Sequence, residues 1–212
     1  MDSLNRLYTE YDTRDHVLLG QNPTLMMPRF GDLPELRVGQ RRYVMAQDGL
    51  YVQSKSSVMC VTVRIVETPP MPYGPLSPSV TMIGGLVPLE LVNQFKNIAR
   101  EVSPTETAAF IVWNKQRYEY VLLSREGVSA SAGHISYLVD DIDRDSIVCN
   151  WHSHGTMNAY FSTTDDASDI DGLYFASVFG QCSQGQTMEI VSRLVIDGLH
   201  IPLKWHPWND HN

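Results

Sequence analysis

The sequence predicts a mixed α/β fold, in which a curved β-sheet flanked by helices follows a β-rich N-terminal extension. Three observations predict it. Strand-like runs recur through most of the chain, one long amphipathic helical pattern interrupts them, and a proline-dense segment separates the first third from the rest. The chain has 212 residues, of which 43% are hydrophobic. This is enough for a buried core in one domain, or in one domain with an extension.

The N-terminal extension is assigned to residues 1–70. Residues 1 to about 38 are polar and contain three prolines, so we expect irregular structure with a short helix near Leu4–Tyr11. Strand-like runs follow, and Gly49 supplies turn freedom between the first two. These runs cover residues 42–46, 49–53 and 58–66. They predict a small β-meander whose role the sequence does not reveal.

A proline-dense segment follows the extension. Within ten residues the chain carries Pro69, Pro70, Pro72, Pro75 and Pro78. Such density disfavours both a helix and a central strand, so the segment is interpreted as an extended connector. A domain boundary is placed here, and a proline-rich loop inside a single domain fits the pattern equally well.

Residues 79–203 are expected to form the main domain. After a short strand at 79–83, apolar residues recur every three or four positions over 88–100, with Pro88 in the first turn, which predicts an amphipathic helix. A short helix is expected over residues 164–171, with Thr163 or Thr164 as its N-cap. Further strands are predicted at 105–113, 118–123, 134–138, 145–151, 173–179, 188–196 and 199–203. Residues 204–212 are expected to be a loose tail.

Composition and charge exclude several classes of protein. The net charge is -8 and only 19% of residues are charged, so the basic patch of a nucleic-acid-binding protein is not expected. No run of eighteen apolar residues and no signal-peptide pattern is present, so neither membrane insertion nor export is expected. The cysteines Cys60, Cys149 and Cys182 are unclustered, which is typical of reduced thiols in a cytoplasmic protein. Cys149 is expected to be a core residue rather than a nucleophile.

The candidate metal-binding residues lie between residues 150 and 165. The run 145–151 is strand-like, and on a strand His152 and His154 would present both imidazoles on one face. The carboxylate of Asp165 follows. Two imidazoles, one carboxylate and a free fourth position are typical of a catalytic zinc site rather than a closed structural one. For the two histidines alone, surface residues beside an acidic loop are the plainer interpretation.

The full pattern, HxHx7SxxD, comprises His152, His154, Ser162 and Asp165. It resembles the metal motif of the JAMM, or MPN-plus, metalloproteases, which include the prokaryotic JAB proteins. The predicted element order over 79–203 also matches that family's core. The resemblance implies Zn²⁺ held by His152, His154 and Asp165, with water in the fourth position. It also implies a peptidase or isopeptidase that uses zinc-activated water to cut at the glycine-ending C-terminal tail of a ubiquitin-like protein.

The resemblance implies two catalytic residues as well. The family's general base is a glutamate at the start of the strand after the first long helix, which corresponds to Glu106 here. The alternatives are Glu101, Glu119 and Glu126. The serine that matches Ser162 helps to hold the oxyanion in the family, and a plain helix cap is an equal interpretation. The family spacing selects Asp165 over the adjacent Asp166 as the ligand.

Two positions depart from the family's pattern. Ala109 stands where glycine is common, three residues after the glutamate, and Gly155 stands where many relatives carry proline. Glycine is expected to loosen the loop that leaves the metal-binding strand. Trp151 and Ser153 should face away from the ligands, with Trp151 in the core.

A longer stretch, residues 151–174, resembles protein A of the bacterial ParB-related, ThiF-related cassette. ThiF relatives activate ubiquitin-like C-termini, so the resemblance implies an E1-like, ThiF-like partner beside a ubiquitin-like substrate. Two other functions are weighed. One is a catalytically silent MPN scaffold that binds partner proteins, against which the intact ligand set argues. The other is a peptidase associated with phage tail assembly.

Overall fold

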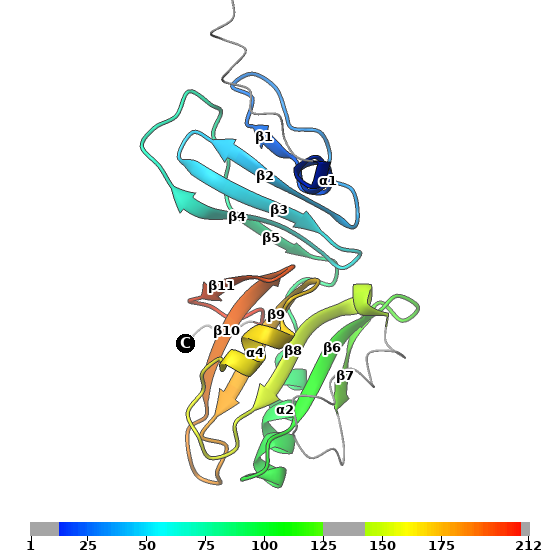
Figure 1. Ribbon diagram of the computed structural model, residues 1–212. Helices are drawn as coiled ribbons and strands as arrows, with labels where there is room; N and C mark the ends of the chain where they lie inside the picture. The colour runs from blue at the N-terminus through cyan, green and yellow to red at the C-terminus, as the bar shows by residue number, and fades with distance from the viewer. Residues whose placement is uncertain (1–12, 125–142, 209–212) are drawn as a thin grey trace, which may run out of the picture. The chain divides into compact units, whose positions relative to one another are not determined.

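A computed structural model describes residues 13–124 and 143–208, and it confirms the mixed α/β fold (Figure 1). Its contacts divide the chain into two compact units. The first comprises Met1–Lys55 and Cys60–Val80, and the second comprises Ser56–Met59 and Thr81–Asn212. The helix expected near residues 4–11 and the strand expected at 134–138 lie outside the described residues.

Most of the first sheet belongs to the first unit. Within the described residues it has five strands in the order β1-β2-β3-β4-β5. The strands are β1 (Thr24–Met26), β2 (Gln40–Ala46), β3 (Gly49–Lys55), β4 (Met59–Glu67) and β5 (Ser79–Met82). β2, β3 and β4 pair antiparallel in sequence order, so the predicted meander is present. Val44, Ala46 and Tyr51 form its buried core.

The expectation of irregular structure up to about residue 38 is wrong in part. Helix α1 (Thr13–Gln21) and strand β1 both fall within that stretch. β1 has three residues and pairs in parallel with β2, so its position depends on backbone hydrogen bonds to a distant part of the chain. Such a short strand has no periodicity that a sequence pattern can detect.

The second unit is built on a mixed sheet, which within the described residues has six strands in the order β11-β10-β9-β8-β6-β7. The strands are β6 (Ala108–Asn114), β7 (Glu119–Ser124), β8 (Ile147–Ser153), β9 (Leu173–Gly180), β10 (Glu189–Ile196) and β11 (Leu199–Leu203). The helices are α2 (Leu89–Val102), the 3₁₀-helix η2 (Arg144–Ser146) and α4 (Thr163–Ser168). β8 and β9 are parallel, so the chain must cross over between them, and α4 lies in that crossover.

Helix α2 covers one face of this sheet. Its buried residues include Phe95, whose ring lies 5.6 Å from that of Trp151 and 4.9 Å from that of Phe179. Trp151 is fully buried, as predicted. Cys149 is also fully buried, and burial raises the pKa of its thiol, so it is a core residue and not a nucleophile. Because β8 side chains alternate and Trp151 packs on α2, the next residue, His152, projects to the opposite face, where it contacts Asp165 of α4.

The expectation of a loose C-terminal tail is wrong as far as Trp208. That side chain is 2% exposed, and its ring lies 5.3 Å from that of Trp151. His206 stacks on it at 4.8 Å, and Val87 forms a β-bridge with it. Burying so large an aromatic surface outweighs the tendency of chain termini to be poorly ordered, on which the expectation rested. In the described parts of the chain, no helix has both the length and the apolar character needed to span a membrane.

Candidate metal centre

The two candidate imidazole ligands lie at the C-terminal end of β8: His152 is in the strand, and His154 directly follows its last residue, Ser153. The Nε2 atoms of His152 and His154 lie 3.2 Å apart. The side chain of His152 is 22% exposed, and His154 is buried, with the ring of Tyr160 packed edge-on against it at 4.6 Å. The two rings therefore converge on one point at the edge of the protein.

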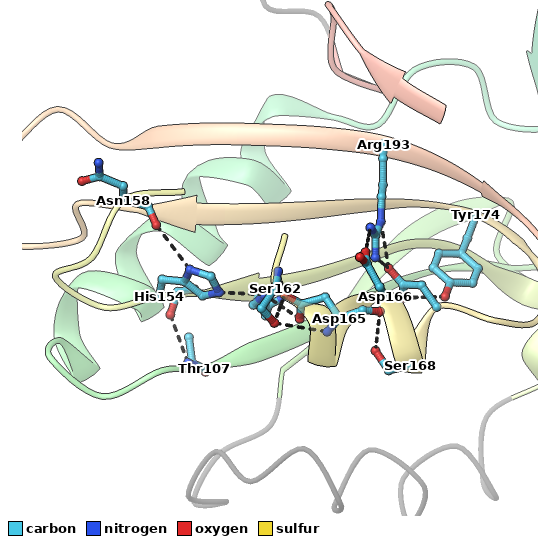
Figure 2. Close-up of polar contacts among 12 residues, drawn as sticks. Thr107, His154, Asn158, Ser162, Asp165, Asp166, Ser168, Tyr174 and Arg193 are labelled. Atoms are coloured by element: carbon cyan, nitrogen blue, oxygen red, sulfur yellow. Dashed lines mark hydrogen bonds and ion pairs between the residues drawn. The ribbon is translucent and has the colours of Figure 1, made fainter. Parts of the chain in front are cut away.

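Helix α4 brings Asp165 to the same point. Its Oδ1 lies 3.3 Å from Nε2 of His152, and one ligand atom from each of the three residues falls within 4.8 Å of the others. The second oxygen, Oδ2, accepts hydrogen bonds from the backbone N–H of Ser162 at 2.6 Å and from its Oγ at 2.7 Å (Figure 2). One oxygen is thus held by the protein, and the other is directed toward the histidines.

Two of the three separations between these ligand atoms fit a tetrahedral metal ion, and the third is within 4.8 Å. Zinc bonds of roughly 2.0–2.1 Å and tetrahedral angles separate neighbouring ligands by about 3.3 Å. The separations of 3.2 Å and 3.3 Å from His152 Nε2 agree with that value. Two imidazoles and one carboxylate leave one tetrahedral position for water or substrate, which distinguishes catalytic from structural zinc sites.

The protonation of the two imidazoles also suits a metal. Nδ1 of His154 lies 3.3 Å from the carbonyl oxygen of Asn158 (Figure 2). Because a carbonyl only accepts, Nδ1 carries the proton and Nε2 keeps its lone pair. Burial lowers the pKa of His152, although the nearby carboxylate of Asp165 raises it in part. A lowered pKa favours the neutral imidazole, the form that binds metals.

The position of Glu106 relative to the ligands is inferred from the pairing of β6 with β8. Ala108 pairs with His152, and the backbone N–H of Ser153 donates to the carbonyl of Thr107 at 2.8 Å. Continuing that antiparallel register by one residue sets Glu106 opposite His154, on the same face of the sheet. Glu106 is half-buried and precedes β6 by two residues, whereas the sequence pattern predicted a strand from residue 105.

The alternatives to Glu106 are less well placed. Glu119 pairs with Asn114 at the opposite end of β6 from Ala108. Six residues of strand separate those ends by about 20 Å. Glu101 is exposed in the last turn of α2, and Glu126 lies outside the described residues.

A comparison with protein families matches residues 88–194 to Prok-JAB, the prokaryotic homologs of the JAB domain. The chain belongs to this family. The JAB family includes metalloproteases. Residues 12–83 match DUF2016, a domain of unknown function. The JAB protein is also similar to the solution structure of protein DSY2949 from Desulfitobacterium hafniense, at 14% identity and a TM-score of 0.38, over 54% of this chain and 86% of that one. No curated protein matches.

In this JAB domain Ser162 is the N-cap of α4, so the expectation that Thr163 or Thr164 caps this helix is wrong. Its Oγ accepts from the backbone N–H of Asp165 at 3.2 Å, while the Asp165 carboxylate accepts from Ser162, which completes a capping box. The neighbouring Asp166 turns away from the histidines and binds Arg193 instead (Figure 2). Sequence reasoning missed Arg193, because nothing in the β10 pattern distinguishes it from an ordinary strand residue.

The loop after β8 is held firmly, so the expectation that Gly155 loosens it is wrong. Gly155 has φ of 55°, and a Cβ there would lie 2.1 Å from the carbonyl oxygen of Pro104. Its own carbonyl accepts from the backbone N–H of Cys182 at 2.7 Å, and His154 N–H donates to the Phe179 carbonyl at 2.8 Å. Glycine is needed because the backbone is left-handed and passes close to another segment.

Gly155→Ala is expected to lower the free energy of unfolding by about 2–4 kcal/mol, through backbone strain and the contact with Pro104. Gly185→Ala is the matched control, because Gly185 has φ of 78° but a Cβ there meets nothing within 4 Å. The control should lose only about 1–2 kcal/mol. Chemical denaturation of both variants measures the difference, and equal losses would contradict the close approach at Gly155.

Proposed function

We propose that this JAB protein is a zinc-dependent peptidase or isopeptidase. The observation that carries the proposal is the convergence of His152, His154 and Asp165, whose ligand atoms all lie within 4.8 Å of one another. His154 and Asp165 are each held by a second contact. When bound, zinc supplies a water molecule of near-neutral pKa and polarises the carbonyl to be attacked.

The proposed general base is Glu106. Its carboxylate accepts the proton of the attacking water and passes it to the leaving amine, which is the task of a base within hydrogen-bonding reach of the reacting atoms. The support is the β6–β8 register, which, continued past Ala108 and His152, would set Glu106 opposite His154.

Ser162 is proposed to assist the oxyanion of the tetrahedral intermediate. Its one hydroxyl proton is donated to Asp165 Oδ2 in this structure. To serve an oxyanion the hydroxyl must rotate away from Asp165. The backbone N–H of Ser162 would then continue to hold Oδ2, at 2.6 Å. The carboxylate therefore stays oriented while the hydroxyl changes its partner.

The proposed substrate is the glycine-ending C-terminal tail of a ubiquitin-like protein, with an E1-like, ThiF-related enzyme as the proposed partner. The support is the motif-level resemblance to JAMM peptidases and the longer resemblance over residues 151–174. A flexible tail can be held extended by main-chain hydrogen bonds, and glycine is the residue that fits where the backbone passes close to a metal site.

The test combines elemental analysis with cleavage of a ubiquitin-like protein fused through a Gly-Gly tail to a reporter. We expect one zinc per chain and cleavage after the second glycine, lost on chelation and restored by zinc. A fusion with leucine at the last tail position is the control and should resist cleavage. A protein that takes up no zinc would refute the proposal. Zinc binding without cleavage of any tail would instead favour a silent scaffold.

A further inference from the structure

Figure 2 shows the guanidinium group of Arg193 beside Asp166, with Asp165 between it and His154. It extends from β10 and is 4% exposed. It donates to Asp166 Oδ1 through one terminal nitrogen. Its other terminal nitrogen and its Nε donate to Asp169 Oδ2, at 2.7 Å and 3.2 Å. One buried cation thus joins two acidic residues of the same short segment.

Arg193 also contacts the residue at the start of this segment, before α4. The ring of Phe161 lies under the guanidinium, with its centroid 3.9 Å from Cζ of Arg193, which is close for a cation–π contact. Phe161 immediately precedes the cap Ser162, Asp166 immediately follows the ligand Asp165, and Asp169 is the C-cap of α4. Arg193 therefore contacts residues on both sides of the candidate metal ligand.

The C-terminal end of the segment is fixed further. The hydroxyl of Tyr174 donates to Asp169 Oδ1 at 2.7 Å, so the two carboxylate oxygens of Asp169 are both occupied. The backbone carbonyl of Asp169 accepts from Nε2 of His200 at 2.8 Å. These contacts belong to neighbouring strands, so they hold the end of α4 to the sheet.

Strand pairing shows that Arg193 shares a face with the histidines. Arg193 pairs with Ala176, and Ala176 pairs with Asn150, two residues before His152 on the same strand. Paired residues, and residues two apart on a strand, project from one face of the sheet. β10 and β8 are separated by one strand, which sets Arg193 roughly 10 Å from the histidine row. It is too far away to bind the same metal.

We propose that Arg193 is a positioning residue for the metal centre: it holds α4 against the sheet so that Asp165 meets His152 and His154. α4 has six residues, too few to be stable without outside contacts. The cap at Ser162 fixes the Asp165 side chain relative to the helix, and Arg193 fixes the helix relative to the strands. The inference rests on the proposed zinc site, but not on hydrolysis.

Simple electrostatics predicts the opposite effect of losing Arg193. Removing a positive charge roughly 10 Å from a divalent cation would tighten metal binding by Coulomb's law. It would also leave Asp166 and Asp169 without their cation. If Arg193 acts by positioning, its loss weakens zinc binding in spite of this gain. The sign of the change therefore separates positioning from an effect of charge.

The test measures zinc affinity by competition with a chromophoric chelator, on the full-length apoprotein and two variants. Arg193→Lys keeps the charge but has no planar fork to span Asp166 and Asp169. Arg193→Met removes the charge. Both are expected to bind zinc on the order of tenfold more weakly. This is within the range for losing a residue that orients a metal ligand without binding the metal itself. The visible spectrum of the Co²⁺-loaded Arg193→Lys protein should also change, as the Asp165 ligand shifts.

Ser192→Ala is the matched control. Ser192 lies beside Arg193 on β10 but faces the other way, and its buried hydroxyl bonds to Ser177 Oγ and His206 Nδ1, each at 2.8 Å. Its loss should lower the melting temperature and leave zinc affinity unchanged. The inference is overturned if Arg193→Lys binds zinc as wild type does, or if Ser192→Ala weakens binding equally. Wild-type protein that binds zinc but cleaves no tail would refute the peptidase, while the affinities still decide the role of Arg193.

Discussion

Replacing Glu106 with glutamine is expected to leave zinc bound and to slow hydrolysis by about 10²–10⁴-fold, the usual contribution of a general base. Glutamine is nearly isosteric and can still form a hydrogen bond with the attacking water, but it cannot accept a proton. The register of β6 against β8 sets Glu106 opposite His154, so no other change in the site is expected. Cleavage rates and zinc content of the same preparation measure both effects.

Glu119→Gln is the control for this substitution, because Glu119 lies at the other end of the β6–β7 hairpin and is exposed. It should cleave at the wild-type rate. If Glu106→Gln is as active as wild type, the base is another residue, and Glu126 would be examined next.

Replacing Asp165 with asparagine is expected to remove zinc from the purified protein and hydrolysis with it. The amide oxygen can still accept from Ser162 and preserve the helix cap, but a neutral amide is a poor ligand for zinc beside two imidazoles. Zinc affinity should fall by more than about a hundredfold. This exceeds the loss that follows from removing a residue that only orients a metal ligand.

Asp171→Asn provides the comparison, because Asp171 is an exposed acid just beyond α4. It loses the same charge without touching the ligand set, and it should keep one zinc per chain. Full zinc occupancy in Asp165→Asn would show that the third ligand lies elsewhere. A folded Asp165→Asn protein, verified by circular dichroism, makes the result independent of stability.

The sequence predicted the features that depend on local spacing. The alternation of β8 and the fixed distance to Asp165 lie within 14 residues, so the ligand set could be proposed before the fold was known. The amphipathic helix α2 and the strands around it follow from periodicity, which local sequence carries well. The ends of strands were less accurate, since β6 begins at Ala108 and not at residue 105.

Features that depend on distant contacts could not be predicted. Arg193 donates a hydrogen bond to Asp169, 24 residues away in sequence, and no short sequence pattern predicts that ion pair. The burial of Trp208 depends on ring contacts with Trp151 of β8 and Phe179 of β9, which are distant in sequence. Ser162 had two equal interpretations because its role as cap depends on where α4 begins, which the structure supplies.

The capping box at the start of α4 links metal binding to the opening of the helix. Asp165 is both the N3 residue that closes the cap and a candidate ligand, so a metal ion that holds its Oδ1 also holds the first helical turn. Any ligand that binds only the closed form stabilises that form by mass action. Amide protons of α4 that exchange through local opening should therefore exchange more slowly with zinc than without it. The N–H groups of Asp166 and Asp169, bonded to the Ser162 and Asp165 carbonyls, would report that change directly.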